Sequence, residues 1–307
     1  MLVVVSSQRF IDHVTPVGHP ERSERAEVLT AVANAFKDQG GEVIEPRAAT
    51  DEDLLRVHTE EHVDAIVATR GKATMIDEDT FTSPDSDEIA RLAAGAVMTG
   101  VDRVLDGPKG SRALVLVRPP GHHAEADRAM GFCLYNNIAV GAAYARSRGC
   151  ARVAIVDYDV HHGNGTQWIF YEDPTVLFVS SHQYPFYPGS GAPSEKGRGE
   201  GLGFTLNVPL DAGARDDEVE RKYADQVIPA VRQFKPDLLM VSAGFDAHEM
   251  DPLGQLRMTT GGFGRLTKIL LGVADDLCEG RLVLVTEGGY DVAALKDCLD
   301  EVIRVSS

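Results

Sequence analysis

Residues 152–165 read RVAIVDYDVHHGNG, and this stretch decides the fold. It opens with an apolar, largely β-branched run, which is typical of a strand buried on both faces of a parallel sheet. Acidic residues and histidines follow at once, where ligands bind in sheets of this kind. We therefore predict a strand over Arg152–Asp159 that carries polar chemistry at its carboxyl end.

Similar apolar runs recur along the chain and predict an α/β fold. Further strands are expected at Leu2–Val5, Ala113–Val117, Thr175–Ser181, Phe204–Val208, Asp237–Ser242 and Arg281–Thr286. Helices are expected between them, at Glu21–Gln39, Ser86–Leu105, Asn136–Arg148, Asp216–Phe234, Gly261–Glu279 and Val292–Ile303. This alternation predicts a central parallel sheet flanked by helices. Because no repeat or linker interrupts residues 1–307, we expect a single domain.

Composition excludes several classes of protein. Hydrophobic residues make up 43% and charged residues 25% of the 307 residues, as in ordinary globular proteins. The formal net charge of −17 argues against a nucleic-acid partner, since such proteins are basic. No signal peptide or membrane span is evident, so we expect no membrane partner and a cytoplasmic location. The widely spaced cysteines, which offer no thiolate zinc site, are Cys133, Cys150, Cys278 and Cys298.

A metal site is predicted from the residues that end two of the strands. Asp157, Asp159 and His161 alternate, and alternate residues of a strand share a face. Carboxylates and an imidazole on one face favour a cation, and mixed Asp/His ligation suits zinc or a similar first-row metal. Asp246 ends the 238–245 run in a matching position. We expect Asp159, His161 and Asp246 to bind the metal; the alternative is a polar network without one.

Two further motifs supply candidate catalytic groups. RPPGHHA at residues 118–124 presents His122 and His123 on a loop shaped by prolines and a glycine. Adjacent imidazoles beside a metal site are candidates for general acid/base catalysis, and we expect Asp157 and Asn164 to fix their tautomers.

The last motif, EGGY, spans residues 287–290. Its glycines permit a sharp turn after a strand, and the phenol of Tyr290 can donate a hydrogen bond to a developing oxyanion. Taken alone, the motif would equally fit a tyrosine that only packs against a turn.

Together these motifs resemble the zinc-dependent histone deacetylase superfamily, which includes bacterial histone deacetylase-like amidohydrolases, acetylpolyamine amidohydrolases and acetoin-utilisation proteins. The resemblance runs from GHPER at residues 18–22 to EGGY, and so covers nearly the whole chain. It implies a single α/β domain of the arginase–deacetylase type, one zinc per chain, and hydrolysis of N-acetyl amides to acetate and free amine.

The resemblance also assigns roles by position. Asp159, His161 and Asp246 match the zinc ligands, and Tyr290 matches the transition-state tyrosine. Members with histidine at that last position are poor deacetylases, so Tyr290 favours activity.

The general acid/base machinery is matched as well. His122 and His123 match the paired catalytic histidines, with Asp157 behind the first and Asn164 behind the second. The implied mechanism has His123, helped by His122, take the proton of a water molecule and later protonate the leaving amine.

The remaining matches concern the substrate tunnel and a second cation. Gly131, Phe132 and Tyr187 match the walls of a narrow tunnel for the acyl-amine chain. Members of the family also hold a monovalent cation, usually potassium, for which Asp157 and Ser180 are the matching side chains.

Two rival functions are weighed against this one. An arginase-like binuclear hydrolase would need further carboxylates where Gly163 and His248 stand. A non-catalytic sensor on the same fold would leave some catalytic position unfilled, whereas all are filled here.

The substrate is the open question. Polyamine-specific eukaryotic members carry a glutamate at the tunnel mouth, where this chain has Leu253. We therefore expect acetyl-lysine-type amides, with acetylpolyamines or other small N-acyl amines as the alternative. A homo-oligomer, used by bacterial polyamine enzymes to restrict access, is left open. Should polyamines be preferred, Asp77, Glu78 and Asp79 are the first carboxylates to examine.

Overall fold

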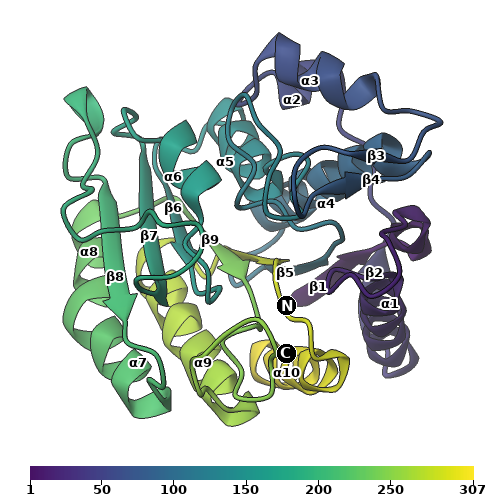
Figure 1. The fold of residues 1–307 in the computed structure, drawn as a ribbon. Helices are drawn as coiled ribbons and strands as arrows, with labels where there is room; N and C mark the ends of the chain where they lie inside the picture. Colours follow the sequence, from purple (N-terminus) through teal and green to yellow (C-terminus); the bar gives the residue numbers. More distant parts are fainter.

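The computed structural model describes residues 1–307 and is built on an eight-stranded sheet in the order β2-β1-β5-β10-β9-β6-β7-β8. Every pair of neighbouring strands in it is parallel (Figure 1). The strands are β1 (Leu2–Ser6), β2 (Glu42–Ile44), β5 (Arg112–Leu116), β6 (Val153–Asp157), β7 (Val176–Gln183), β8 (Thr205–Leu210), β9 (Leu238–Ala243) and β10 (Leu282–Thr286). A separate antiparallel ribbon pairs β3 (Thr74–Met75) with β4 (Phe81–Thr82).

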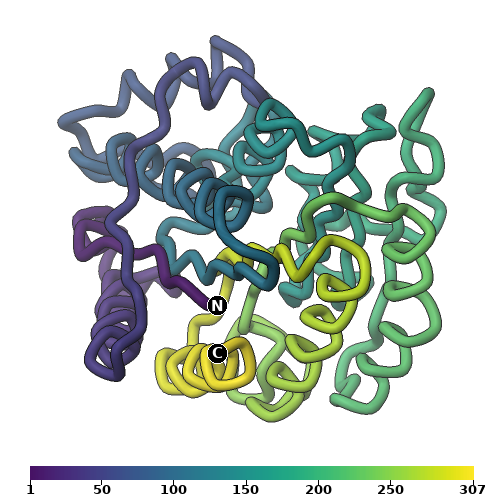
Figure 2. The backbone as a smooth tube through the Cα atoms, turned by 180° about the vertical axis from the view of Figure 1, so that it is seen from behind, coloured from purple at the N-terminus to yellow at the C-terminus, as the bar shows by residue number.

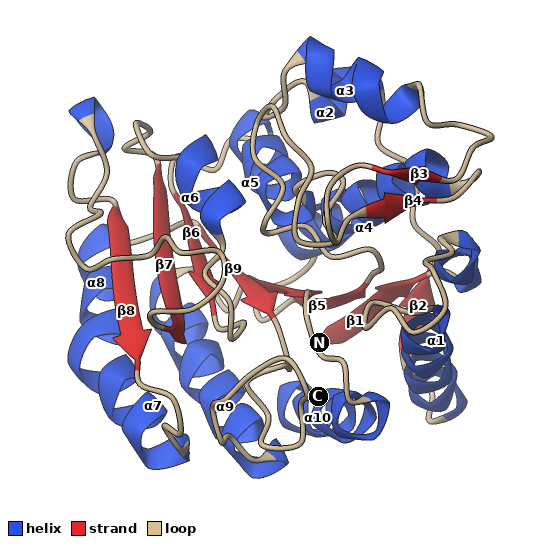
Figure 3. Cartoon of the chain, in the orientation of Figure 1, coloured by secondary structure: helices blue, strands red, loops and turns tan.

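Helices cover both faces of the sheet, as a parallel sheet requires (Figure 3). The helices are α1 (Ser23–Asp38), α2 (Asp51–Leu54), α3 (Glu60–Val67), α4 (Ser86–Asp106), α5 (Asn137–Ser147), α6 (Asn164–Ile169), α7 (Asp216–Lys222), α8 (Ile228–Phe234), α9 (Thr260–Leu277) and α10 (Val292–Ser306). One core packs the sheet against α1 and α7 to α10, and a second packs its other face against α4 and α5. A third cluster seats α3 on α4 and α5.

The predicted fold class is confirmed. All seven predicted strands are present within a few residues, and the four cysteines are free and buried. The predicted helix over 216–234 is present as α7 and α8, joined by a π-helical turn at Tyr223–Val227. The short strand β2 at the sheet edge, the β3–β4 ribbon and the short helices α2, α3 and α6 were not predicted.

The order of the strands is what assembles the site. Strands β5, β10, β9 and β6 are consecutive neighbours in the sheet, although they are far apart in the sequence. Each of them carries one motif at its carboxyl end: RPPGHHA after β5, EGGY after β10, SAGFDAHEMDP (residues 242–252) at the end of β9, and DYDVHHGNG (residues 157–165) at the end of β6. Because parallel strands end at the same edge, the four loops converge there.

The two termini lie side by side, as views from the front and from behind both show (Figures 1 and 2). The amino group of Met1 donates to the Gly110 carbonyl at 2.7 Å, and Arg112 Nη1 donates to the Ser306 carbonyl at 3.2 Å. None of the helices has the length and apolar character needed to cross a membrane.

Candidate active site

Strand β6 ends at Asp157, two residues earlier than the sequence predicts. The prediction that alternation along a strand aligns Asp157, Asp159 and His161 is therefore wrong. Instead, each carboxylate accepts a backbone hydrogen bond from two residues further on: Asp157 Oδ1 from Asp159 N at 3.0 Å, and Asp159 Oδ1 from His161 N at 2.9 Å. These local turns, and not the alternation of a strand, orient the carboxylates of Asp157 and Asp159.

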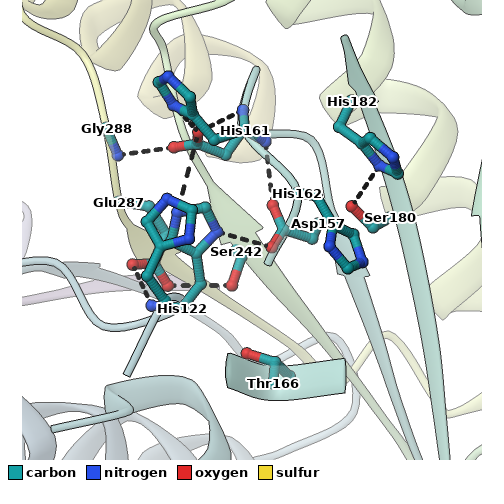
Figure 4. Close-up of polar contacts among 12 residues, drawn as sticks. His122, Asp157, His161, His162, Thr166, Ser180, His182, Ser242, Glu287 and Gly288 are labelled. Carbon is teal, nitrogen blue, oxygen red and sulfur yellow. Dashed lines mark hydrogen bonds and ion pairs between the residues drawn. The ribbon is translucent and has the colours of Figure 1, made fainter. Parts of the chain in front are cut away.

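Asp159, His161 and Asp246 come together at the carboxyl ends of β6 and β9. Their ligand atoms all lie within 4.8 Å of one another, and all three residues are buried. His161 Nδ1 is 3.1 Å from Asp159 Oδ1 and 3.1 Å from Asp246 Oδ2. Asp157 is not part of this group, because its carboxylate faces His122 (Figure 4).

The electrostatics of this group call for a positive charge between the carboxylates. Burial lowers the pKa of His161, but its bonds to Asp159 and Asp246 outweigh that effect and raise the pKa to about 10. Burial and the neighbouring Asp159 raise the pKa of Asp246 to about 7. Burial opposes ionisation of Asp159 too, yet His122 and His161 hold its pKa below the usual value. A divalent cation satisfies the same demand with one ion, and the donor set of two carboxylates and an imidazole fits zinc.

Glycines lie so close to the candidate metal-ligand carboxylates that no residue with a side chain could replace either glycine. A Cβ on Gly288 would lie 2.0 Å from Asp246 Oδ2, and one on Gly244 would lie 2.0 Å from Asp159 Oδ2. Gly288 N also donates to Asp159 Oδ2 at 2.8 Å (Figure 4). Gly288 of the EGGY motif and Gly244, which follows β9, therefore allow the backbone to approach the candidate ligands directly.

The two histidines of the RPPGHHA loop lie beside the candidate metal-ligand group of Asp159, His161 and Asp246. Their ring centroids are 4.1 Å apart, and the ring of His123 lies 5.9 Å from that of His161. His122 Nδ1 is 2.9 Å from Asp157 Oδ2, and His123 Nδ1 is 2.7 Å from Asn164 Oδ1. Because a carboxylate and an amide oxygen both accept, each Nδ1 carries a proton and each Nε2 is left for chemistry.

The two imidazoles differ in charge. Burial lowers the pKa of His122, but the Asp157 and Asp159 carboxylates outweigh burial and raise it to about 10. Burial, together with the nearby His122 and His161, holds the pKa of His123 well below its usual value. At neutral pH the pair thus consists of an imidazolium that is paired with Asp157 and a neutral imidazole.

Tyr290 reaches the same cavity from the loop after β10. Its backbone N–H donates to Asp251 Oδ2 at 2.6 Å, and its ring contacts that of Phe132 edge-on with centroids 5.7 Å apart. The guanidinium of Arg25 lies 5.1 Å from the ring centroid. Burial and the nearby Asp246 raise the pKa of Tyr290 well above its ordinary value, so the phenol keeps its proton.

A cavity of about 170 Å³ connects these groups to the surface. It is lined by Asp79, His123, Gly131, Phe132, His161, Tyr187, Leu253 and Tyr290. The volume is small compared with the 300–1,000 Å³ or so of pockets for drug-sized ligands, so it suits a short, narrow chain. Phe132 has φ of 69° and directly follows Gly131 at φ of 57°, two left-handed residues in succession. Backbone strain of this kind persists where the surroundings impose it, commonly at functional sites.

Asp157 and Ser180 are directly paired in the register of β6 and β7. Ser180 Oγ is also 2.9 Å from His182 Nδ1, and that ring lies 4.7 Å from the ring of His162 (Figure 4). The register of β6 and β7 therefore places the two candidate potassium ligands on adjacent strands.

Two carboxylates near the site, Asp251 and Glu287, were not assigned roles from the sequence. A third, Asp79, was named from the sequence only as a carboxylate to examine should polyamines be preferred; it is half-buried on the loop between β3 and β4 and lines the cavity. Asp251 accepts from Leu253 N at 2.9 Å as well as from Tyr290 N. Glu287 lies buried behind the RPPGHHA loop. Only the position of Asp251 and Glu287 within the SAGFDAHEMDP and EGGY motifs could have drawn attention to them.

The arginase-like alternative gains no support. His248 Nε2 is 3.3 Å from Thr260 Oγ1, and Nδ1 accepts from Met250 N at 3.2 Å, so both ring nitrogens are engaged away from the candidate metal-ligand group. A Cβ on Gly163 would lie 2.3 Å from Asp157 Oδ2, which leaves no room there for a carboxylate side chain.

Comparison with known proteins decides the family. A family model described as the histone deacetylase domain matches residues 19–306. The chain belongs to the histone deacetylase family. Hydrolytic deacetylation of acetylated amides is the activity that goes with this membership, and it accords with the resemblance seen in the motifs.

Individual relatives agree with this placement. A probable deacetylase from Archaeoglobus fulgidus is 39% identical over 295 residues, which cover 94% of this chain and 81% of that protein. A histone deacetylase-like amidohydrolase from Pseudomonas aeruginosa is 42% identical over 253 residues, covering 81% and 66% of the two chains. The crystal structure of the HDA15 HD domain superposes with a TM-score of 0.91 at 38% identity, covering 99% of this chain and 90% of that one.

Proposed function

We propose that residues 1–307 form one catalytic domain that removes acetyl groups from amines with a zinc ion held by Asp159, His161 and Asp246. The observation that carries the proposal is the buried convergence of two carboxylates and an imidazole beside a histidine pair. Three protein ligands leave a coordination position for water and substrate, which is typical of catalytic rather than structural zinc sites. When bound, zinc would polarise the amide carbonyl and lower the pKa of a water molecule.

The histidines divide the proton transfers in this proposal. His123 is neutral, and Asn164 holds the proton on Nδ1, so Nε2 can accept the proton of water. His122 remains charged beside Asp157 and stabilises the negative charge that develops as the amide is attacked. His123 then returns its proton to the leaving amine, which completes the cycle.

Tyr290 serves in the proposal as the donor to the oxyanion. Its pKa is raised, so the phenol is protonated throughout the pH range in which the enzyme would act. Asp251 fixes the backbone of Tyr290, and Phe132 packs against its ring. A donor that is fixed before the reaction stabilises the transition state without reorganisation.

Acetyl-lysine-type amides are the proposed substrates, with acetylpolyamines or other small N-acyl amines as the alternative. Gly131, Phe132, Tyr187 and Leu253 would contact the alkyl chain, since all four line the narrow cavity. Asp79 favours acetylpolyamines as additional substrates, because its carboxylate could attract a second ammonium group on the substrate.

A potassium ion near Asp157 and Ser180 is proposed as a second, structural cation. The register that pairs these residues across β6 and β7 supports it, because potassium prefers oxygen ligands of this kind. Activity should rise when potassium replaces a bulky organic cation in the buffer, with the zinc content unchanged. Equal activity in both buffers would refute this part of the proposal.

The zinc proposal is tested by metal analysis and a variant. We expect about one zinc per chain, as a single three-ligand site implies. Asp246→Ala should lose both the metal and the hydrolysis of an acetyl-lysine peptide. Glu249→Ala, which removes an exposed carboxylate from the same loop, is the matched control and should keep both. Full activity in metal-free protein would refute the proposal.

Two features stay predictions of the sequence. A cytoplasmic location would be tested by cell fractionation. A homo-oligomer would be tested by sedimentation of the purified protein.

A further inference from the structure

Glu287 is a fully buried carboxylate that none of the proposed steps uses. It follows β10 directly and lies behind the RPPGHHA loop (Figure 4). Its Oε2 accepts from Gly121 N at 2.7 Å and from His122 N at 3.2 Å. Its Oε1 accepts from Ser242 Oγ at 3.0 Å. Burying a carboxylate is unfavourable unless it is well bonded, so its presence calls for a reason.

The backbone that carries this carboxylate is itself held on two sides. Glu287 N donates to the Ala243 carbonyl at 3.1 Å, which ties it to β9. Its carbonyl accepts from Arg25 Nη2, and Arg25 Nε donates to the Gly289 carbonyl at 2.7 Å. Arg25 in turn pairs with Glu21 at 3.0 Å. Because hydrogen bonds hold both its backbone and its carboxylate, Glu287 is fixed in one conformation.

The carboxylate joins two loops that hold different parts of the site. The RPPGHHA loop carries His122 and His123, and the EGGY loop carries Tyr290 three residues after Glu287. The bonds to Asp157 and Asn164 orient the imidazole rings from the side of β6. The bonds to Gly121 N and His122 N are the ones that fix the loop backbone toward β10.

We infer that Glu287 is a positioning residue that sets the distance between the histidine pair and Tyr290 by accepting the Gly121 and His122 amide protons. This inference rests on the proposed function, because it matters only if those groups act on one substrate. Reacting groups must be held to within a fraction of an ångström, and a displacement of about 1 Å can lower the rate about 10²-fold. What Glu287 supplies is the acceptor, not the negative charge.

The shape of the side chain allows these two roles to be separated. Burial, partly offset by the nearby His122, raises the pKa of Glu287 to about 7, so near neutral pH the side chain is present in both the charged and the neutral form. Glu287→Gln keeps an oxygen for the two amides and can donate to the Ser242 hydroxyl. Glu287→Met has about the same length and volume but offers no oxygen, so it removes the acceptor without leaving a cavity.

The experiment compares these variants as zinc-loaded full-length protein with an acetyl-lysine peptide. We expect Glu287→Met to lower kcat about 10²-fold with KM nearly unchanged, whereas Glu287→Gln should stay within about threefold of wild type. In parallel, hydrogen exchange at the Gly121 and His122 amides should be slow in the wild type and Gln variant and much faster in the Met variant.

A matched control separates positioning from stability. Thr286 precedes Glu287 and is equally buried; its Oγ1 accepts from Val117 N at 2.8 Å and donates to the Val117 carbonyl at 2.9 Å. Thr286→Val removes these two hydrogen bonds, which join the end of β10 to the residue just after β5, before the RPPGHHA loop begins. It should lower the melting temperature and leave kcat unchanged.

The outcomes distinguish the inference from the proposed function. Slow exchange at both amides in Glu287→Met, or a Gln variant as impaired as the Met variant, would overturn the inference. Inactive wild-type protein with the expected exchange pattern would instead count against the proposed function alone. If the Met variant does not fold, Ser242→Ala takes its place, because it removes the hydrogen bond that holds Oε1 of Glu287. A loss of kcat smaller than the one expected for Glu287→Met would support the inference. An unchanged kcat would overturn it.

Discussion

His58 is buried and bonds both ends of segment 125–136, which carries the cavity residues Gly131 and Phe132, and its protonation should destabilise the fold. Its Nδ1 is 3.0 Å from the Glu125 carbonyl, to which it donates, and its Nε2 accepts from Asn136 N at 2.9 Å. A second proton would sit on Nε2 and face the N–H of Asn136, so two donors would meet. Burial, with a smaller effect from His62, accordingly lowers the pKa of His58 from 6.5 to about 3.

The sign and size of the effect follow from linkage. Because the folded pKa is below the unfolded one, the unfolded chain binds more protons between about pH 3 and pH 6.5, and stability falls as the pH falls through that window. At pH 5 the contribution of His58 amounts to a loss of about 2 kcal/mol relative to pH 7.5, where it is close to zero.

The assay is urea unfolding of wild type and His58→Gln at pH 7.5 and pH 5. Glutamine can still accept from Asn136 N but does not titrate. The variant should lose about 2 kcal/mol less than wild type between the two pH values, since the other titrating groups cancel in the comparison. Equal losses in the two proteins would show that His58 is not the buried neutral base described here.

Two further predictions concern the chemistry. Tyr290→Phe should keep the metal content and KM but lower kcat about 10²–10³-fold in steady-state assays, because only a transition-state donor is removed; an unchanged kcat would make Tyr290 a packing residue. Asp79→Asn should lower kcat/KM for N8-acetylspermidine about fivefold more than for a neutral acetyl-lysine peptide, as expected for a partly exposed ion pair. The exposed neighbour Glu78→Gln is its control, and equal effects on both substrates would exclude Asp79 as a contact for a second ammonium group.

The central strands could be predicted from the sequence because each is an apolar run that must be buried on both faces. Strand β6 is the clearest case, with all five residues buried. The edge strand β2 escaped prediction because Glu42–Ile44 has only three residues and none of them is buried. Helices α2 and α3 are short, and their place depends on packing against α4 and α5 rather than on their own periodicity.

The site residues at strand ends could be predicted from the sequence, whereas the contacts between distant segments could not. Asp159, His161 and Asp246 could be predicted because each lies at or just after a strand end, and parallel strands bring their ends together. Strand alternation does not orient these side chains, because β6 ends at Asp157 and hydrogen bonds within turns orient the carboxylates of Asp157 and Asp159. Local sequence patterns do not encode contacts such as Glu287 with Gly121, which are 166 positions apart.

The glycines around the proposed metal-ligand carboxylates have a consequence for how this enzyme can diversify. Any side chain at Gly244 or Gly288 would collide with Asp159 or Asp246, so these two positions admit almost no change in sequence. The mouth of the cavity is different, because Asp79, Tyr187 and Leu253 lie on loops and none of the three is buried. A library that aims to alter substrate preference should therefore randomise those three loops, and descendants of this chain with new substrates should differ from it there.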